Sequence, residues 1–346
     1  MLERFKQAKK EPERESPDAN EEIDKEGLSR RKFMQLGASA ALAGAFTLDL
    51  AGQYPAFAQL LDPNVAVDQF DYDKAVGEAK RFFKQGYDVN LFVGAGNEHS
   101  YISGGGTTIE KYRDSLRLLT EEFEGKYTDD MIKQLGKGRG GLGIRIASNL
   151  AWTKKNDQGD TIVYKETGLV PGSIPGKSAP IFLNADNRED FQRQLIHHEM
   201  QHRAFHERED QEVLLSQWRD VHKGVSLGEV YRPREKGVED RGVPSESYFL
   251  TNYAGTSVWE DMATCAEWIM TPLQFAKFIE RIRTEKDPVL KEILEKKFIA
   301  TRRFYEKWDG GEKINTAFWE RMGTEGYRQL LKEITKKPPE QLARVR

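Results

Sequence analysis

The segment His198-Glu199-Met200-Gln201-His202 has the pattern H-E-x-x-H. In a helix, two histidines four residues apart lie on one face, one turn apart, so both imidazoles reach one metal ion. Neutral imidazole is a good zinc ligand, and Glu199 can reach a water on the metal as general base. Because the chain has only six histidines, a chance occurrence is on the order of one per cent. The sequence therefore predicts a zinc site with ligands His198 and His202 and the base Glu199.

The residues around this segment predict a helix over 187–209. From Phe191 to Phe205, apolar residues and the two metal histidines follow at spacings of four, three, four and three. They form one stripe that faces the core, because a helix repeats every 3.6 residues. Asp186 and Asn187 are candidate N-caps. The run 179–184 before the helix predicts a strand beside it, and we expect this strand to be a sheet edge that pairs with an extended substrate.

The rest of the chain predicts an α+β fold with a small mixed sheet and a mostly helical C-terminal half. Before the metal motif, a helix is expected over 69–86, and a second begins at the capping box of Thr107 to Glu110. Strands are expected at 88–93, 142–147, 161–164 and 179–184, with a glycine-rich loop at 94–106. The helices expected from residue 187 onward are 187–209, 211–222, 258–270, 272–285, 287–308 and 315–335.

The histidines offer few alternatives for a third ligand. A metzincin site needs glycine and histidine where this chain has Phe205 and Arg208. His206 lies one turn beyond His202, and three histidines on successive turns of one straight helix rarely converge on one ion. His197 points about 100° away from His198, which favours a supporting or structural role. The remaining two histidines, His99 and His222, have no supporting spacing.

A second segment carries the better candidate. Glu260-Asp261-Met262-Ala263 follows Tyr253 by seven residues. Together with H-E-x-x-H, it resembles the second motif of gluzincin metallopeptidases, especially the group related to the anthrax lethal factor catalytic domain. The resemblance covers roughly residues 179–270. It implies a zincin-like fold that holds one Zn²⁺ and hydrolyses peptide bonds. Glu260 would be the third ligand, Ala263 would pack against the motif helix, and Tyr253 would stabilise the oxyanion.

The chain departs from this pattern at Thr264, where many relatives have a second acid. Glu267 lies on the same helix face as Glu260, so it is the alternative ligand or a supporting partner. Asp261 is placed to orient a histidine nitrogen. The segment Gly224–Asn252, which is rich in glycine, proline and charge, is expected to form a cleft wall or a lid.

The N-terminal segment predicts export. Residues 3–26 are charged or polar and are expected to be disordered. Then follow Ser29-Arg30-Arg31-Lys32-Phe33, the apolar run 36–48 and the small-residue site Ala56-Phe57-Ala58. This order resembles a twin-arginine signal peptide. It implies a signal at 1–58, a metallopeptidase domain at 59–346, and a chain that folds and takes up its metal before the translocase carries it to the periplasm or outside the cell. The alternative, an uncleaved anchor helix, is disfavoured because the apolar run is too short to span a bilayer.

Composition excludes several other functions. The chain has 53 Lys and Arg residues and 56 Asp and Glu residues. We therefore expect neither a basic surface for nucleic acid nor a stable membrane anchor. Cys265 is the only cysteine, which rules out a disulfide within the chain and suggests a small buried side chain rather than a nucleophile. The sequence Val93 to His99 fails the dinucleotide fingerprint because His99 replaces the third glycine.

The sequence leaves three functional interpretations. The first is an exported metallopeptidase, with endopeptidase action favoured. The second is a zinc amidase or hydrolase that acts on cell-wall or other non-protein amides. The third is an inactive zinc-binding module, which Glu199 argues against because a purely structural site needs no base and prefers four protein ligands.

Overall fold

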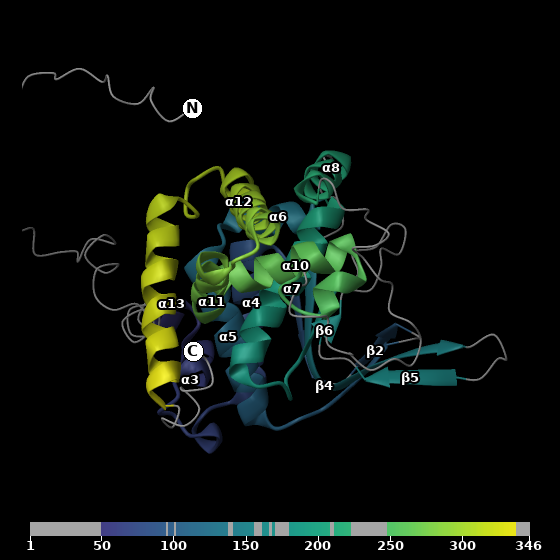
Figure 1. Ribbon diagram of the computed structural model, residues 1–346. Helices are drawn as coiled ribbons and strands as arrows, with labels where there is room; N and C mark the ends of the chain where they lie inside the picture. Colours follow the sequence, from purple (N-terminus) through teal and green to yellow (C-terminus); the bar gives the residue numbers. More distant parts are fainter. Residues whose placement is uncertain are drawn as a thin grey trace, which may run out of the picture. The chain divides into compact units, whose positions relative to one another are not determined.

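The computed structural model describes residues 50–94, 96–99, 102–137, 141–155, 161–165, 168–169, 180–207, 211–222 and 248–336. Asp49–Arg346 is one compact unit. The described part is mostly helical and contains one small mixed sheet (Figure 1). The predicted combination of a mixed sheet with a mostly helical C-terminal half is therefore confirmed, but the strands do not all come first, because helices also precede and separate them. Among the described residues, no helix is long and apolar enough to cross a bilayer.

Strand β4 (Leu142–Lys155) organises the sheet. Its first half pairs in parallel with β1 (Val89–Val93) on one side and with β7 (Ile181–Asn184) on the other. The residues of this half are buried, as expected for parallel strands covered on both faces. The direction of pairing changes near Asn149, whose φ of 48° lies in the left-handed region that asparagine tolerates.

Beyond Asn149 the pairing is antiparallel. The second half of β4 pairs with β3 (Ile102–Gly105) and with β5 (Thr161–Lys165), and β3 pairs with β2 (Gly96–His99). This part of the sheet extends away from the helices (Figure 1). The sequence 94–106 was expected to be a loop. It forms β2 and β3 instead, because β4 continues past residue 147 and supplies the hydrogen-bonding partner.

Strand β7 is not the sheet edge that the sequence predicts. The short strand β6 (Gly168–Leu169) pairs with it in antiparallel register, Gly168 opposite Leu183 and Leu169 opposite Phe182. Within the described sheet, β6 is therefore the edge on this side. A strand of two residues has no alternating pattern that could reveal it in the sequence.

In the described part of the chain, the α-helices before the metal motif include α3 (Pro55–Leu61), α4 (Tyr72–Tyr87), α5 (Ile109–Lys126) and α6 (Asp129–Gly136). Side chains of Asp71, Thr108 and Thr128 accept hydrogen bonds from the first turns of α4, α5 and α6. The two predicted helices, α4 and α5, are confirmed, and α6 was not predicted. The predicted domain boundary at residue 58 falls inside α3.

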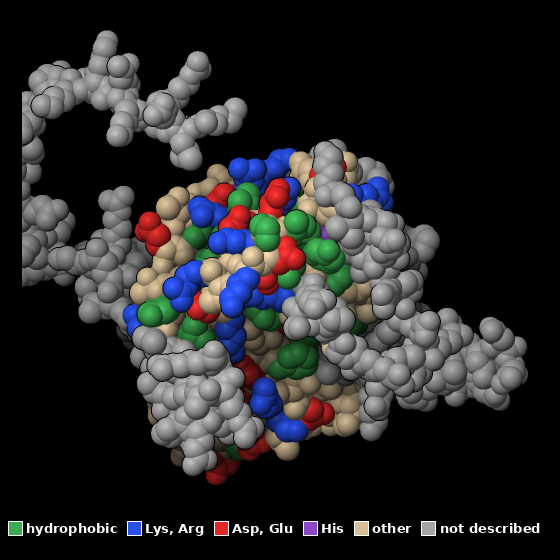
Figure 2. All heavy atoms as spheres, viewed as in Figure 1, with side chains coloured by type: hydrophobic (Ala, Val, Ile, Leu, Met, Phe, Trp, Pro, Cys, Tyr) green, Lys and Arg blue, Asp and Glu red, His purple; other side chains and the backbone are tan. Residues whose placement is uncertain are grey.

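The C-terminal half contains the six helices that the sequence predicts: α7 (Glu189–Glu207), α8 (Gln211–Val221), α10 (Val258–Met270), α11 (Pro272–Thr284), α12 (Pro288–Asp309) and α13 (Thr316–Lys336). Ser257 caps α10, and Asp287 caps α12 ahead of a proline in the first turn. The visible face in Figure 2 has basic and acidic side chains interspersed, in keeping with the near balance of charges in the sequence.

Candidate metal centre

Helices α7 and α10 position the centre. They pack side by side (Figure 1), and α7 also contacts α5 and β7. Ala263 of α10 is completely buried, as expected of a small residue at a close helix contact. One turn past the motif, the rings of Phe205 and Trp259 lie 4.1 Å apart. The side of α7 that carries His198 and His202 therefore faces the first turn of α10, where Glu260 lies.

Three ligand atoms converge at this point. The Nε2 atoms of His198 and His202 are 3.2 Å apart, and each lies 3.1 Å from Oε2 of Glu260. The side chain of His198 is buried, and those of His202 and Glu260 are 16% and 20% exposed. Among the described residues, these three form a group that can hold a metal ion. The centre is thus closed on the protein side and partly open to solvent.

The geometry of the three atoms fits a small divalent cation. Around a tetrahedral zinc with bonds of about 2.0–2.1 Å, ligand atoms lie about 3.3–3.4 Å from one another. The observed triangle of 3.1–3.2 Å edges is close to this size. Hydrogen bonds alone do not explain the triangle. Each Nε2 atom carries at most one proton, so the two imidazoles supply at most two protons for the three contacts among these atoms. A cation on the axis of the triangle would satisfy all three acceptors.

The charges around the centre favour a cation too. Burial alone would lower the pKa of His198, but the surrounding carboxylates, led by Glu260 and Glu267, raise it to about 10. Burial would raise the pKa of Glu260, yet its contacts with both imidazoles hold it well below its usual value. The same negative field that favours a proton on His198 would stabilise a divalent ion in its place.

The supporting residues lie on two sides of His198. Oε2 of Glu267 lies 3.3 Å from Nδ1 of His198, on the ring edge that faces away from the ligand triangle. Nδ1 makes no hydrogen bond in the structure, so the contact with Glu267 is one of charge and distance alone, and this carboxylate lies outside the ligand triangle. Tyr253 begins a short 3₁₀ helix (Tyr253–Thr256), and its ring centroid is 5.9 Å from that of His198. Glu199 is buried, and its charge acts on His198.

Asp261 lies near a histidine nitrogen, as predicted, within a buried polar group. Its carboxylate accepts hydrogen bonds from Nε1 of Trp218 at 3.0 Å and from Nζ of Lys297 at 2.9 Å, and it lies 3.5 Å from Nε2 of His222. It thus faces a histidine nitrogen, but not that of a metal ligand. Burial would raise the pKa of Asp261, and the Lys297 ammonium holds it below its usual value. Lys297 also donates to the Tyr248 carbonyl at 2.5 Å. This group ties α10 to α8, α12 and the segment before Tyr253.

A second buried polar group lies behind α7. Nε2 of His197 is 2.8 Å from Oε2 of Glu122 and 3.1 Å from Nζ of Lys126, and Nδ1 is 2.7 Å from the hydroxyl of Tyr127. Burial and the Lys126 ammonium lower the pKa of His197 to about 4. Lys126 also donates to the carbonyl of Met270 at 2.5 Å. His197 therefore joins α5 to α7 and, through Lys126, to the end of α10, which is the structural role expected for it.

Sequence reasoning missed Lys297 and Lys126, although the position of Lys297 in an apolar stripe could have indicated its burial. The buried face of α12 includes Leu290, Ile293, Leu294, Lys297, Thr301 and Phe304. A lysine at a core position of an apolar stripe is rarely buried without a partner, so it predicts a buried acid on a neighbouring element. Which acid it meets depends on tertiary packing.

Other candidates lie outside the described residues or away from the centre. His99 belongs to β2 and His206 to α7, but their side chains are not described, and most of the expected lid, 223–247, is outside the described residues. Cys265 is buried, and burial raises the pKa of its thiol well above its usual value. Its thiol is therefore held in the protonated form, as is usual for a cysteine that packs in a core.

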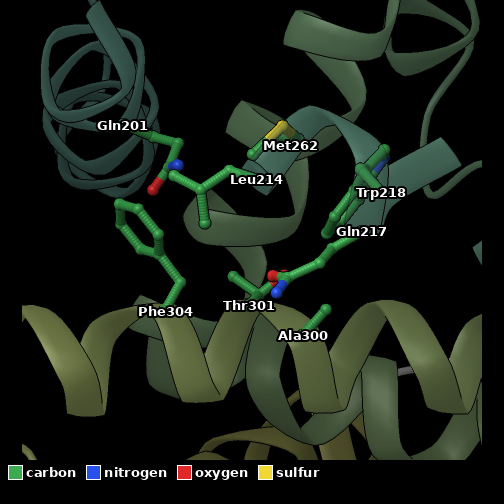
Figure 3. Close-up of a pocket in the computed structure, with 8 residues that line it drawn as sticks. All are labelled: Gln201, Leu214, Gln217, Trp218, Met262, Ala300, Thr301 and Phe304. Carbon is green, nitrogen blue, oxygen red and sulfur yellow. The ribbon is translucent and has the colours of Figure 1, made fainter. Parts of the chain in front are cut away.

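A small cavity lies near Gln201 of the motif but does not belong to the centre (Figure 3). It has a volume of about 20 Å³ and is lined by residues of α7, α8, α10 and α12, and by none of the three candidate ligands. The Oε1 atom of Gln201 is buried without a hydrogen-bond partner. This volume suits one water molecule, which would satisfy that oxygen.

Comparisons with protein family models, with characterised proteins and with solved structures gave no significant match.

Proposed function

We propose that this chain is an exported zinc metallopeptidase with a gluzincin site on a zincin-like fold. The observation that carries the proposal is the convergence of His198 Nε2, His202 Nε2 and Glu260 Oε2 within 3.2 Å of one another. Glu199 lies on the same helix, next to the first histidine. Three protein ligands beside a buried glutamate are typical of a catalytic zinc site, since structural sites usually have four ligands.

When bound, zinc would supply Lewis acidity and make water acidic enough to lose a proton at neutral pH. Glu199 would accept that proton and deliver it to the leaving amine. The phenol of Tyr253 would donate a hydrogen bond to the oxygen of the scissile carbonyl as negative charge develops there. Glu267 would hold the His198 ring in the orientation that directs Nε2 at the ion.

The cellular part of the proposal rests on the N-terminal sequence. The arginine pair at Arg30 and Arg31 would direct the folded chain to the twin-arginine translocase, and the protein would act in the periplasm or outside the cell. Zinc would enter before export. The expected partners are a peptide or protein substrate and the translocase, without nucleic acid.

The test compares the full native chain with Glu199→Gln and Glu260→Gln. We expect one zinc per native chain and cleavage of casein or a peptide library. Glu199→Gln should keep its zinc and lose cleavage, whereas Glu260→Gln should lose cleavage and bind zinc much more weakly. The matched control is Glu295→Gln, because Glu295 is exposed on α12, and it should behave as the native chain.

Two results would reject the proposal. If Glu199→Gln cleaves as fast as the native chain, Glu199 is not the base. If native zinc-loaded protein releases peptides from peptidoglycan but leaves casein and the library intact, the enzyme is an amidase of the cell wall.

A further inference from the structure

The segment Ala56-Phe57-Ala58, which the sequence marks as a signal-peptidase site, is buried in the folded domain. It lies in helix α3 (Pro55–Leu61), where Phe57 and Leu60 are completely buried. Ala56 and Ala58 are 5% and 6% exposed. The bond after Ala58 therefore lies in a helix that buries five of its seven side chains, although Gln59 itself is exposed. A processing enzyme binds its substrate extended and cannot reach this bond unless α3 first unfolds.

Polar contacts hold the start of α3 in place. The backbone amides of Ala56 and Phe57 both donate to Oε2 of Glu78 in α4, at 2.7 and 3.0 Å. Glu78 is only 3% exposed, and its Oε2 atom accepts both of these hydrogen bonds, while Oε1 lies 3.8 Å from the Arg81 guanidinium. The hydroxyl of Tyr54 donates to Gln85, also in α4, at 2.5 Å. Removing residues 54–58 would leave a buried carboxylate without these donors.

Aromatic packing joins α3 to the centre of the helical layer. The Phe57 ring lies 5.6 Å from Phe82 and 6.4 Å from Phe83. Phe83 in turn lies 5.8 Å from Phe123 of α5. The cluster thus runs from α3 through α4 to α5, and α5 contacts the metal-motif helix α7. Loss of Phe57 would open a cavity at one end of this chain of contacts.

We propose that residues 50–61 are a permanent part of the folded domain and that the bond after Ala58 is not cleaved in the folded protein. Any processing then takes place N-terminal to Leu50, which is itself buried. The burial argument is independent of the zinc site. The order of events, with folding before processing, rests on the proposed twin-arginine export.

The first experiment measures burial alone. The purified full chain is treated with elastase, which accepts small residues such as alanine, in buffer and in urea. We expect the Ala58–Gln59 bond to be cut at least a hundredfold more slowly in buffer. Glu78→Ala should speed that cut in buffer by at least about tenfold, because opening of α3 then breaks no charged hydrogen bonds. The control Asp73→Ala changes an exposed acid on the same helix and should have no effect.

A milder variant covers the case in which Glu78→Ala does not fold. Tyr54→Phe removes one hydrogen bond and should speed cutting several-fold. Equal rates of cutting in buffer and in urea would overturn the proposal, and so would a Tyr54→Phe variant cut no faster than the native chain.

The second experiment identifies the N-terminus of the exported protein by intact mass. An N-terminal residue at or before Leu50 supports the proposal, whereas one at Gln59 overturns it. Arg30→Lys combined with Arg31→Lys tests the export route separately. If that variant is still exported, the twin-arginine proposal fails, while the elastase result continues to decide whether α3 is buried.

Discussion

Replacing Glu260 by glutamine tests the candidate metal centre most directly. The change keeps the size of the side chain and removes the charge that lies 3.1 Å from both histidine nitrogens. Binding of about 10–16 kcal/mol at a four-ligand zinc site corresponds to about 3 kcal/mol per ligand, or roughly two orders of magnitude in Kd. We therefore expect Glu260→Gln to bind zinc about 100-fold more weakly than the native chain.

This loss converts into a thermal shift. At free zinc about 100 times the native Kd, binding stabilises the native chain by about 2.7 kcal/mol, but the variant by only about 0.4 kcal/mol. A folded unit of about 300 residues (Asp49–Arg346) has an unfolding entropy of roughly 0.6 kcal/mol/K. Zinc should therefore raise the Tm by about 4 °C in the native chain and by less than about 1 °C in the variant.

The assay combines zinc competition against a chromophoric chelator with thermal melts of metal-free and zinc-loaded protein. Glu267→Gln gives an intermediate reference, because it removes a partner of His198 and not a ligand, and should weaken zinc by about 10–100-fold. Glu295→Gln, exposed on α12, should match the native chain. The reasoning is refuted if Glu260→Gln binds zinc as tightly as the native protein, or if Glu267→Gln loses more affinity than Glu260→Gln.

Three further predictions concern catalysis, stability and pH. Tyr253→Phe should lower kcat by about 10²–10³-fold with zinc affinity unchanged, measured against Tyr327→Phe, a tyrosine that is 60% exposed; an unchanged kcat would remove Tyr253 from the mechanism. Lys297→Met leaves the buried carboxylate of Asp261 unpaired and should lower the free energy of unfolding by about 3–5 kcal/mol in urea titrations. Its control is Lys296→Met on the exposed side of α12, and a loss of under about 1 kcal/mol would contradict the assigned ion pair. In the folded protein the pKa of Asp186 is lowered to about 2, mainly by its hydrogen bond with Lys111. In the unfolded chain the pKa of an aspartate is about 3.9. Ionised Asp186 therefore stabilises the fold fully above a pH of about 3.9, and this stabilisation is lost as the pH falls toward about 2. Unfolding free energies between these pH values should therefore fall less steeply in Asp186→Asn than in the native chain, and an identical slope would contradict the prediction.

Local periodicity explains why the sequence predicted so many elements of the fold. Helices α4, α5 and α10 begin directly after Asp71, Thr108 and Ser257, whose side chains cap them. Capping and apolar stripes act within a few residues, so they are readable from the sequence alone. The strands β2, β3 and β6 escaped prediction because short strands depend on a partner far along the chain for their hydrogen bonds.

The same distinction applies to the buried charges. The sequence identified Asp261 as a partner for a histidine nitrogen, and the fold supplies that of His222 together with Lys297 and Trp218. Nothing local selects among these residues, because they come from α8, α10 and α12 and meet only when those helices pack. The boundary at residue 58 likewise followed from a short motif, whereas the burial of Phe57 follows from contacts with α4.

By itself, the sequence determined that His198 and His202 lie on one face of a helix, since a separation of four residues is close to one helical turn. It also made Glu260 a candidate through its resemblance to a known motif. Only the tertiary structure decided that this carboxylate, rather than Glu267, meets both Nε2 atoms. The reason is that the packing of α10 on α7 sets the distance between residues some sixty positions apart, and no local pattern encodes that distance.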